Sequence, residues 1–285
     1  MKTGTRNFFY FSFTAFLFFS SSILPQSGKA VSPDGVEIAY TVYGSGEPAI
    51  VFIHGWNCNQ SYWKNQVPVI SAKYTVVTLD LAGYGQSGVG RENYTMEAFG
   101  EDVAAVVNKL GLTKVVLVGH SMGGAVVIEA ANRLKGKVIG VIGADTFQNL
   151  GITMPAGQVE PFLKPFRENF TEKVKSFVKS MFLPNSDSLL VKKVSADMSS
   201  SSPRIALSAM ENMFADDGTA ALKEFSVPLI SINCDRYPIL EESNRKIVKR
   251  YDLKMMHGVG HFVMLEDPVK FNSLLQESIE ELLKD

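Results

Sequence analysis

The chain has 285 residues, of which 46% are apolar, and its 28 basic and 29 acidic side chains leave a net charge of −1 at pH 7. This length suits one large domain or one domain with an insertion, and the apolar content supplies a sizeable core, which excludes a disordered chain. The balanced charge excludes a general attraction to nucleic acid or to anionic membranes, so we expect a small, largely neutral substrate.

The N-terminal 30 residues differ from the rest of the chain. Lys2 and Arg6 precede an apolar, aromatic-rich run over residues 8–24, and small residues follow Pro25. This pattern predicts a secretory signal peptide over residues 1–30, and therefore a secreted or periplasmic protein. A retained N-terminal anchor is the alternative, although polar residues interrupt the apolar run. We expect contact with a membrane only if this segment is retained.

The next part of the chain alternates predicted strands with glycine-rich loops. Residues 36–44 alternate with a period of two, which predicts an antiparallel edge strand. Residues 49–53 are an unbroken apolar run, which predicts a central strand, and they end in a His-Gly-Trp segment at 54–56. A further strand is predicted over 74–80, and apolar residues at helical spacing predict a helix over 95–110.

The clearest motif lies between residues 114 and 131. The apolar run 115–118 predicts a buried parallel strand, and the Ala-rich run after Gly124 predicts a buried helix. The Gly-His-Ser-Met-Gly segment at 119–123 joins them in a tight turn, which holds Ser121 in a strained conformation and needs glycines where a β-carbon would collide. The first N–H groups of the helix point at any charge that develops beside Ser121, which suits an oxyanion. We therefore predict that Ser121 is a nucleophile.

The chain changes character after the strand predicted over 138–144. Residues 150–222 contain amphipathic helical runs rich in Phe, Met and Lys, which predict a helical insertion. Residues 227–235 and 252–256 return to the strand pattern, and residues 268–283 predict a closing helix.

These motifs resemble those of the α/β-hydrolase family. The resemblance rests on Gly-His-Ser-Met-Gly-Gly at 119–124, His-Gly-Trp at 54–56 and Gly-His at 260–261, and it covers about residues 33–285. It implies an α/β fold with a mostly parallel eight-stranded sheet, helices on both faces and a helical cap inserted after the sixth strand. We therefore expect a hydrolase core formed by residues 31–149 and 223–285, and a cap formed by residues 150–222.

The resemblance also implies roles for residues around the nucleophile. The backbone N–H groups of Trp56 and Met122 are expected to form the oxyanion hole, and Gly55 allows the backbone to approach the serine. His54 is expected to have a structural or pocket-lining role beside this hole. His120 lies inside the elbow, where it cannot turn back to the hydroxyl of its neighbour, and we place it in the pocket.

A serine hydroxyl needs a base within hydrogen-bond reach and an acid that orients the base. His261 is the predicted base, because it occupies the family's Gly-His position in a loop after the last strand, whereas His257 lies where that strand should still be pairing. Two acids remain open. Asp235 follows the strand that usually carries the acid in the family, but the chain there lacks a glycine and is one residue shorter than the family pattern. Asp145 ends the preceding strand, where some family branches recruit their acid. We expect Asp235, with Asp145 as the alternative.

Other candidate residues are expected to be structural. Asp80 precedes a glycine-punctuated loop that shapes the site in the family, and Gly83-x-Gly85 is too short for a dinucleotide fingerprint. Cys58 and Cys234 are the two cysteines, and we expect free thiols rather than a disulfide. No cluster of His, Cys and Asp has metal-ligand spacing, so we expect no metal and no cofactor.

Together these residues predict acyl transfer. The expected function is a serine hydrolase that cleaves a small or medium carboxylic ester, thioester or lactone through an acyl-enzyme on Ser121. A cofactor-free perhydrolase or haloperoxidase-like enzyme and a non-catalytic ligand sensor on the same fold are the alternatives. The expected partner is a small-molecule acyl substrate, with no nucleic acid.

Overall fold

The computed structural model describes residues 1, 24–151, 154–215 and 218–284. Its described part contains one eight-stranded sheet with the strand order β1-β2-β4-β3-β5-β6-β7-β8. The strands are β1 (Gln26–Val31), β2 (Glu37–Tyr43), β3 (Ala49–Ile53), β4 (Thr75–Leu79), β5 (Val115–His120), β6 (Val138–Ala144), β7 (Leu229–Cys234) and β8 (Tyr251–Met256). The pairings β1–β2 and β2–β4 are antiparallel, and all the others are parallel. The predicted mostly parallel, eight-stranded α/β sheet is therefore confirmed.

The strand β1 corrects the predicted start of the folded domain. It pairs with β2 along its whole length, from Gln26 opposite Val42 to Val31 opposite Glu37. A turn closed by hydrogen bonds between Ser32 and its neighbours joins the two strands into a hairpin. Residues 26–30, which we assigned to the signal peptide, therefore belong to the sheet, because the antiparallel ladder continues to Gln26. The rest of that predicted segment, residues 2–23, lies outside the described residues.

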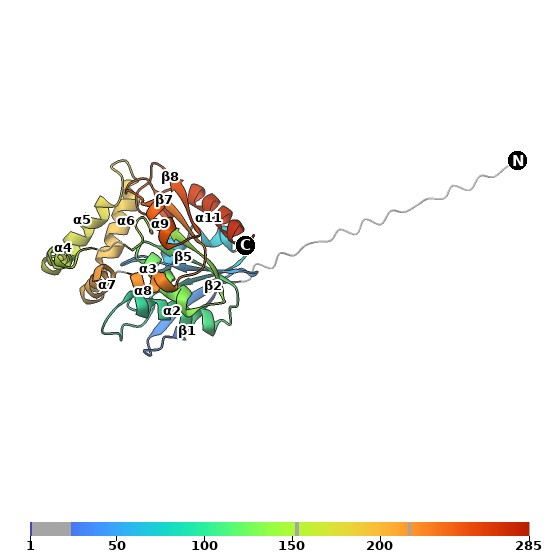
Figure 1. Cartoon of the computed structure of the whole chain (residues 1–285), viewed down its shortest axis with the longest axis horizontal. Helices are drawn as coiled ribbons and strands as arrows, with labels where there is room; N and C mark the ends of the chain where they lie inside the picture. The colour runs from blue at the N-terminus through green and yellow to red at the C-terminus, as the bar shows by residue number, and fades with distance from the viewer. Residues whose placement is uncertain (2–23, 152–153, 216–217, 285) are drawn as a thin grey trace.

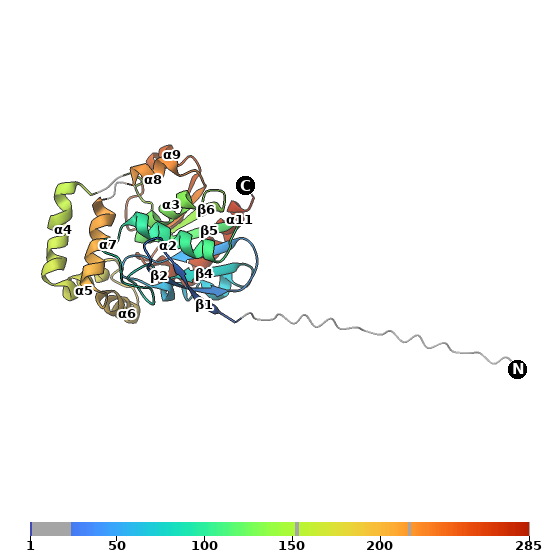
Figure 2. The same cartoon turned by 90° about the horizontal axis from the view of Figure 1, so that it is seen from below.

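Helices cover both faces of the sheet (Figures 1 and 2). Helices α2 (Met96–Lys109) and α3 (Met122–Arg133) pack against each other, and α11 (Pro268–Leu282) contacts β6, β7 and β8. Shorter helical segments are η1 (Gln60–Trp63), α1 (Val67–Ile70), α9 (Glu241–Ile247) and α10 (Val263–Glu266). No helix in the described ranges reaches the length and apolarity that crossing a bilayer requires.

A helical cap lies between β6 and β7, as the sequence predicted. It consists of α4 (Ala156–Glu168), α5 (Phe170–Ser180), α6 (Ser188–Ser199), α7 (Pro203–Ala215) and α8 (Thr219–Glu224). Figure 2 shows α4, α5, α6 and α7 grouped at one side of the sheet. Cap residues such as Phe177 and Met213 line cavities together with Ser121 and His261, which follow β5 and β8. The cap therefore covers the carboxyl ends of the parallel strands, where open α/β sheets bind their ligands.

Candidate active site

The turn between β5 and α3 presents Ser121. This residue has a φ of 53° and a ψ of −118°, which is a strained conformation for any residue other than glycine. A β-carbon on Gly119 would lie 2.3 Å from the carbonyl oxygen of Gly123, and one on Gly123 would lie 2.7 Å from the carbonyl oxygen of Ile53. The two glycines are therefore needed because the strand, the turn and the helix approach so closely, as the sequence analysis predicted.

Backbone strain is concentrated around this turn. Among the described residues, the non-glycine residues with positive φ are Asn57, Ser121, Asp145 and Phe147. They lie in the segments that follow β3, β5 and β6, at the carboxyl ends of three neighbouring strands. Strained residues persist where the surrounding structure holds them, and they cluster at functional sites. The strain therefore points to the same end of the sheet as the serine motif.

His261 lies beside Asp145 at this end of the sheet. Its Nδ1 is 2.5 Å from Asp145 Oδ2, and the side chains are 12% and 0% exposed. The other carboxylate oxygen, Asp145 Oδ1, accepts a hydrogen bond from the N–H of Cys234 at 3.0 Å. With Nδ1 engaged by the carboxylate, Nε2 of His261 is left to exchange a proton with a substrate or with Ser121. Ser121 and His261 line the same two cavities.

Asp235, the acid we expected, lies elsewhere. Its Oδ2 is 2.9 Å from Nδ1 of His257, and these side chains are 47% and 74% exposed. The chain turns immediately after Cys234, and Arg236 then donates hydrogen bonds to the carbonyl oxygens of Ser180 and Phe182 in the cap. This short turn leaves the Asp235 carboxylate at the surface. The expected contact between Asp235 and His261 is therefore wrong, and Asp145, the alternative, occupies that position.

The two predicted oxyanion-hole amides belong to the loop after β3 and to the first turn of α3. A β-carbon on Gly55 would lie 3.2 Å from Ser121 Cβ, so the loop after β3 approaches the serine as predicted. Met122 is the first residue of α3, where N–H groups have no partner inside the helix. Within the described part of the chain, no hydrogen bond uses the backbone N–H of Trp56 or of Met122. Both amides are thus available to an oxyanion.

His54 holds two loops together and does not line either cavity at the serine. Its Nε2 accepts the N–H of Leu81 at 3.0 Å, and its Nδ1 donates to the carbonyl oxygen of Gly55 at 2.8 Å. Burial lowers the pKa of His54, which keeps the ring neutral. Asp80 is also structural, because its buried carboxylate accepts hydrogen bonds from the amides of Gln60 and Gln86.

The sequence did not indicate that His120 and Glu266 fix the loop that carries His261, which we call the base loop. The Nε2–H of His120 donates to the carbonyl oxygen of His261 at 3.1 Å, and burial lowers the pKa of His120 well below its ordinary value. Glu266 Oε1 accepts the N–H groups of Gly260 at 3.0 Å and of Phe262 at 3.3 Å, the two neighbours of His261. The position of Glu266, a few residues after the Gly-His pair, is the one sequence signal that could have indicated this role.

Ser121 and His261 face two spaces of unequal size. The first, which we call the inner cavity, has a volume of about 60 Å³. Besides Ser121 and His261, its walls are formed by Trp56, Cys58, His120, Phe177, Met181, Met198, Met210, Met213, Phe214 and Phe262. The second, which we call the outer cleft, has a volume of about 630 Å³ and extends along the loop after β6 and along α3 and α8. His120 thus lines a pocket as expected.

The described residues contain no cluster of three or more His, Cys, Asp or Glu side chains arranged to hold a metal ion. Cys58 and Cys234 are both buried and are free thiols. Burial raises the pKa of Cys58, and the same cause raises that of Cys234 to about 12. These thiols therefore do not supply a thiolate at neutral pH.

Comparison with known proteins gives the family. A family model described as the alpha/beta hydrolase family matches residues 50–274. The non-heme chloroperoxidase of Kitasatospora aureofaciens is 41% identical over 92 residues, which are 32% of this chain and 33% of that protein. The chain thus aligns with about a third of the length of this curated relative.

Solved structures show the same fold along the whole domain. An esterase from Thermogutta terrifontis has a TM-score of 0.78 at 21% identity and covers 90% of this chain and 99% of its own. A bromoperoxidase from Bacillus anthracis has a TM-score of 0.77 at 23% identity, covering 91% and 100%. Because the family match extends over well more than half of the chain, the protein belongs to the alpha/beta hydrolase family.

Proposed function

We propose that the protein is a serine hydrolase that cleaves a small or medium carboxylic ester through an acyl-enzyme on Ser121. The observation that carries the proposal is the arrangement of three groups: a strained, half-buried serine, a histidine that lines the same cavities, and a buried aspartate 2.5 Å from that histidine. The esterase among the structural neighbours supports this reading, although its likeness by itself concerns the fold.

The proposed reaction has two halves, acylation of Ser121 and hydrolysis of the acyl-enzyme, and the same three groups act in both. His261 Nε2 takes the hydroxyl proton as Ser121 Oγ forms a bond to the ester carbonyl carbon, and the oxyanion receives the N–H groups of Trp56 and Met122. His261 then gives the proton to the alcohol oxygen as the carbon–oxygen bond breaks. In the second half, His261 Nε2 takes a proton from a water molecule as the water oxygen forms a bond to the acyl carbon. His261 then gives this proton to Ser121 Oγ as the bond between Oγ and the acyl carbon breaks, which releases the acid and restores Ser121. Asp145 orients the imidazole and stabilises its charged form.

The same acyl-enzyme supports a second candidate, a cofactor-free perhydrolase. Hydrogen peroxide would replace water in the second half of the reaction, so that the product is a peroxy acid, which oxidises a halide. The observation that favours this candidate is the stretch at 41% identity to a non-heme chloroperoxidase. Halogenation of a dye that requires acetate, peroxide and Ser121 together would support it, whereas halogenation by the Ser121→Ala variant would exclude it.

The primary test is a burst experiment with p-nitrophenyl acetate. The intact protein should release p-nitrophenol in a rapid burst that is stoichiometric with enzyme, followed by slower turnover, because acylation precedes the attack of water. Ser121→Ala should abolish both phases. Ser200→Ala is the matched control, because this serine lies on the exposed surface of the cap, and it should leave both phases unchanged. A burst that survives in Ser121→Ala would contradict the proposal.

A further inference from the structure

The two spaces at Ser121 share part of their walls, including Phe177, Met181, Met213 and Phe214, and differ in the rest. Trp56, Met198 and Met210 border only the inner cavity, whereas Met122, Asp145 and Phe147 are among the residues that border only the outer cleft. An ester has two parts joined at its carbonyl carbon, and that carbon must lie at Ser121, where the two spaces meet. The structure therefore offers one space to the acyl chain and the other to the alcohol.

The order of events in the reaction decides which part enters which space. The alcohol must leave after acylation, and water must then reach the same side of the acyl carbon, because His261 handles the proton in both halves. The acyl chain, in contrast, stays bound between the two halves. The outer cleft is wide and reaches solvent, so it suits the departing alcohol and the incoming water, and the inner cavity suits the chain that remains.

The volume of the inner cavity limits the acyl chain. One water-sized sphere takes up roughly 10–15 Å³ of cavity volume. A volume of about 60 Å³ therefore admits roughly four to six non-hydrogen atoms. The walls that the chain meets are methionine and aromatic side chains, which favour an unsubstituted hydrocarbon chain over a polar one.

Hydrogen bonds fasten these walls to the oxyanion-hole loop. The indole Nε1–H of Trp56 donates to the carbonyl oxygen of Ala206 in α7 at 2.7 Å. The side-chain amide of Asn57 donates to the carbonyl oxygen of Met198 in α6 at 3.1 Å. The helices that carry Met198 and Met210 are thus tied directly to the loop that carries the Trp56 N–H, so the cavity cannot widen without disturbing the oxyanion hole.

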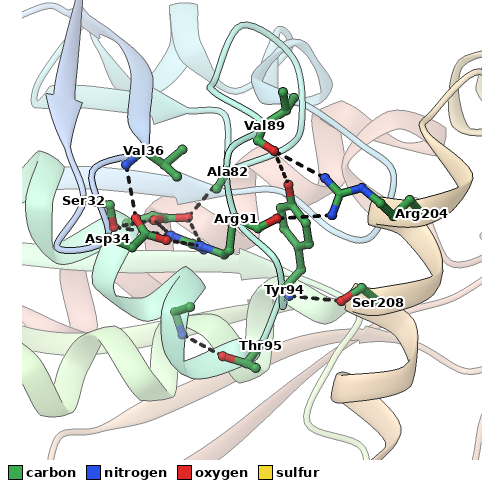
Figure 3. Close-up of polar contacts among 12 residues, drawn as sticks. Ser32, Asp34, Val36, Ala82, Val89, Arg91, Tyr94, Thr95, Arg204 and Ser208 are labelled. Atoms are coloured by element: carbon green, nitrogen blue, oxygen red, sulfur yellow. Dashed lines mark hydrogen bonds and ion pairs between the residues drawn. The ribbon is translucent and has the colours of Figure 1, made fainter.

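A polar network also fixes α7 to the core from its other side (Figure 3). Arg204 donates to the carbonyl oxygen of Arg91 at 3.2 Å, and Ser208 Oγ accepts the N–H of Tyr94 at 3.1 Å. Arg91 is itself held by the buried carboxylate of Asp102, with Nη2 2.6 Å from Oδ1. Anchoring at both sides makes the α7 wall rigid, and a rigid wall produces a sharp limit on chain length.

The outer cleft is much larger than the inner cavity. Its volume of about 630 Å³ lies in the range of roughly 300–1,000 Å³ that is typical of sites for drug-sized ligands. Phe147, Leu150 and Leu222 supply apolar surface there, while Gln148 and Asn149 supply polar groups. This space accepts a bulky, mainly apolar alcohol or phenol. A small alcohol would leave most of the apolar surface of the cleft without a contact.

Resting on the proposed serine hydrolysis, we propose that the inner cavity is the acyl site and that the outer cleft is the alcohol site. The substrate is then an ester of a short, unbranched acid, with about two to six carbons, and a bulky apolar alcohol or phenol.

Two series of esters test this assignment on the unmodified protein. In the first, p-nitrophenyl esters run from acetate through butyrate and octanoate to laurate, so that only the acyl chain changes. We expect kcat/KM to rise from acetate to butyrate, because each methylene that finds a place contributes about fourfold. It should fall at least about tenfold by octanoate, because the roughly seven carbons beyond its carbonyl group exceed the roughly four to six atoms that the cavity admits. In the second, acetates of ethanol, 2-phenylethanol and 2-(1-naphthyl)ethanol, which are alcohols of similar leaving-group ability, should show kcat/KM rising with the size of the alcohol.

Matched methionine variants test which space sets the limit on acyl-chain length. Met210→Ala removes three non-hydrogen atoms from the inner cavity, so the ratio of kcat/KM for octanoate to that for acetate should rise about tenfold or more. Met96→Ala removes the same atoms from the outer cleft at the same low exposure of 1%, so this ratio should stay within about twofold. If Met210→Ala fails to fold, Met198→Ala in α6 tests the same wall.

The outcomes separate this assignment from the proposed function. Efficient hydrolysis of laurate or octanoate, a preference for ethyl acetate over the acetate of 2-(1-naphthyl)ethanol, or an equal shift in Met96→Ala and Met210→Ala would overturn the assignment and leave serine hydrolysis intact. Absence of hydrolysis and of a burst with every ester would instead overturn the proposed function itself. A short-acyl limit that moves only with the inner-cavity variants supports the assignment.

Discussion

The described residues include two Asp–His pairs on loops at the same end of the sheet. Asp145 and His261 form one pair, with side chains 0% and 12% exposed, and Asp235 and His257 form the other, with side chains 47% and 74% exposed. The residues of each pair come from similar places in the chain, because both aspartates follow parallel strands and both histidines follow β8. Burial and orientation, rather than residue type, distinguish the two pairs.

The buried pair is held by its surroundings, whereas the exposed pair is not. The N–H of Cys234 fixes one oxygen of Asp145, and Glu266 fixes the backbone on both sides of His261. In a buried site these hydrogen bonds are strong and keep the imidazole in one orientation. An exposed pair is screened by water and contributes little energy. Only the buried pair is both shielded from water and held on both partners, which are the conditions under which a carboxylate can fix the orientation of a histidine.

Replacing the acid should give the largest difference between the pairs. Asp145→Asn should lower kcat by about 10⁴-fold with little change in KM, because the amide favours the wrong tautomer of His261. Asp235→Asn is the matched control and should change kcat less than about twofold, since the partner of its carboxylate among the described residues is His257 rather than His261. Steady-state kinetics with p-nitrophenyl butyrate provide the measurement. A large loss in Asp235→Asn with none in Asp145→Asn would reverse the assignment of the acid.

Removing the support of the base loop should have a smaller effect on activity. Glu266→Ala leaves the N–H groups of Gly260 and Phe262 without their acceptor, which costs about 1–3 kcal/mol per unsatisfied group and frees the loop. We expect kcat to fall roughly 10- to 100-fold, and Glu266→Gln, which keeps one acceptor oxygen, to recover part of it. His257→Gln, on the exposed pair, should leave kcat unchanged. Equal kcat in Glu266→Ala and the intact protein would show that the loop needs no such support.

The pH dependence of stability should separate buried from exposed histidines. Burial lowers the pKa of His54 and of His120 in the folded state, so below about pH 6.5 the unfolded chain binds protons that the folded chain does not. The free energy of unfolding should therefore decrease as the pH falls below about 6.5, by up to about 1.4 kcal/mol per pH unit for each histidine.

Urea unfolding at neutral and mildly acidic pH measures this slope. His120→Asn should flatten it, and His257→Gln, which replaces a side chain that is 74% exposed, is the surface control. The same slope in the two variants would contradict the account of His120 as a neutral, buried ring.

Removing the exposed pair should have the smallest effect of all these changes, and the quantity to measure is the free energy of unfolding. Asp235→Asn should change the free energy of unfolding by less than about 1 kcal/mol, and added salt should reduce even that difference. Urea unfolding at low and high ionic strength is the measurement. A salt-independent loss well above this value would mean that Asp235 and His257 are held as firmly as the buried pair.

The sequence was sufficient where a local pattern carries the information. The alternation in β2, the apolar runs of β3 and β5 and the glycines around Ser121 predicted the sheet and the elbow correctly, because each depends on short-range sterics and burial. The cap was also predicted from its helical periodicity. The start of the domain was not, because residues 26–30 are small and polar and lie next to an apolar segment, so nothing local marks them as an edge strand.

The choice of acid depended on contacts that no local pattern encodes. Asp145 and Asp235 both end strands, and their different positions follow from the length of the turn after Cys234 and from the hydrogen bonds of Arg236 to the cap. The roles of His120 and Glu266 likewise arise from contacts with the loop that carries His261. This loop is distant in sequence from His120, whereas it folds back onto Glu266, which follows it closely. Such information becomes visible only when the ends of β5, β6 and β8 are brought together.

The central claim is that Ser121 is activated by His261 and Asp145, and labelling with a fluorophosphonate followed by peptide mass spectrometry tests it most directly. The account predicts one adduct, on the peptide that contains Ser121, formed at the same rate in the intact protein and in Asp235→Asn and far more slowly in Asp145→Asn. An adduct on another serine, or equal labelling rates in Asp145→Asn and the intact protein, would contradict it.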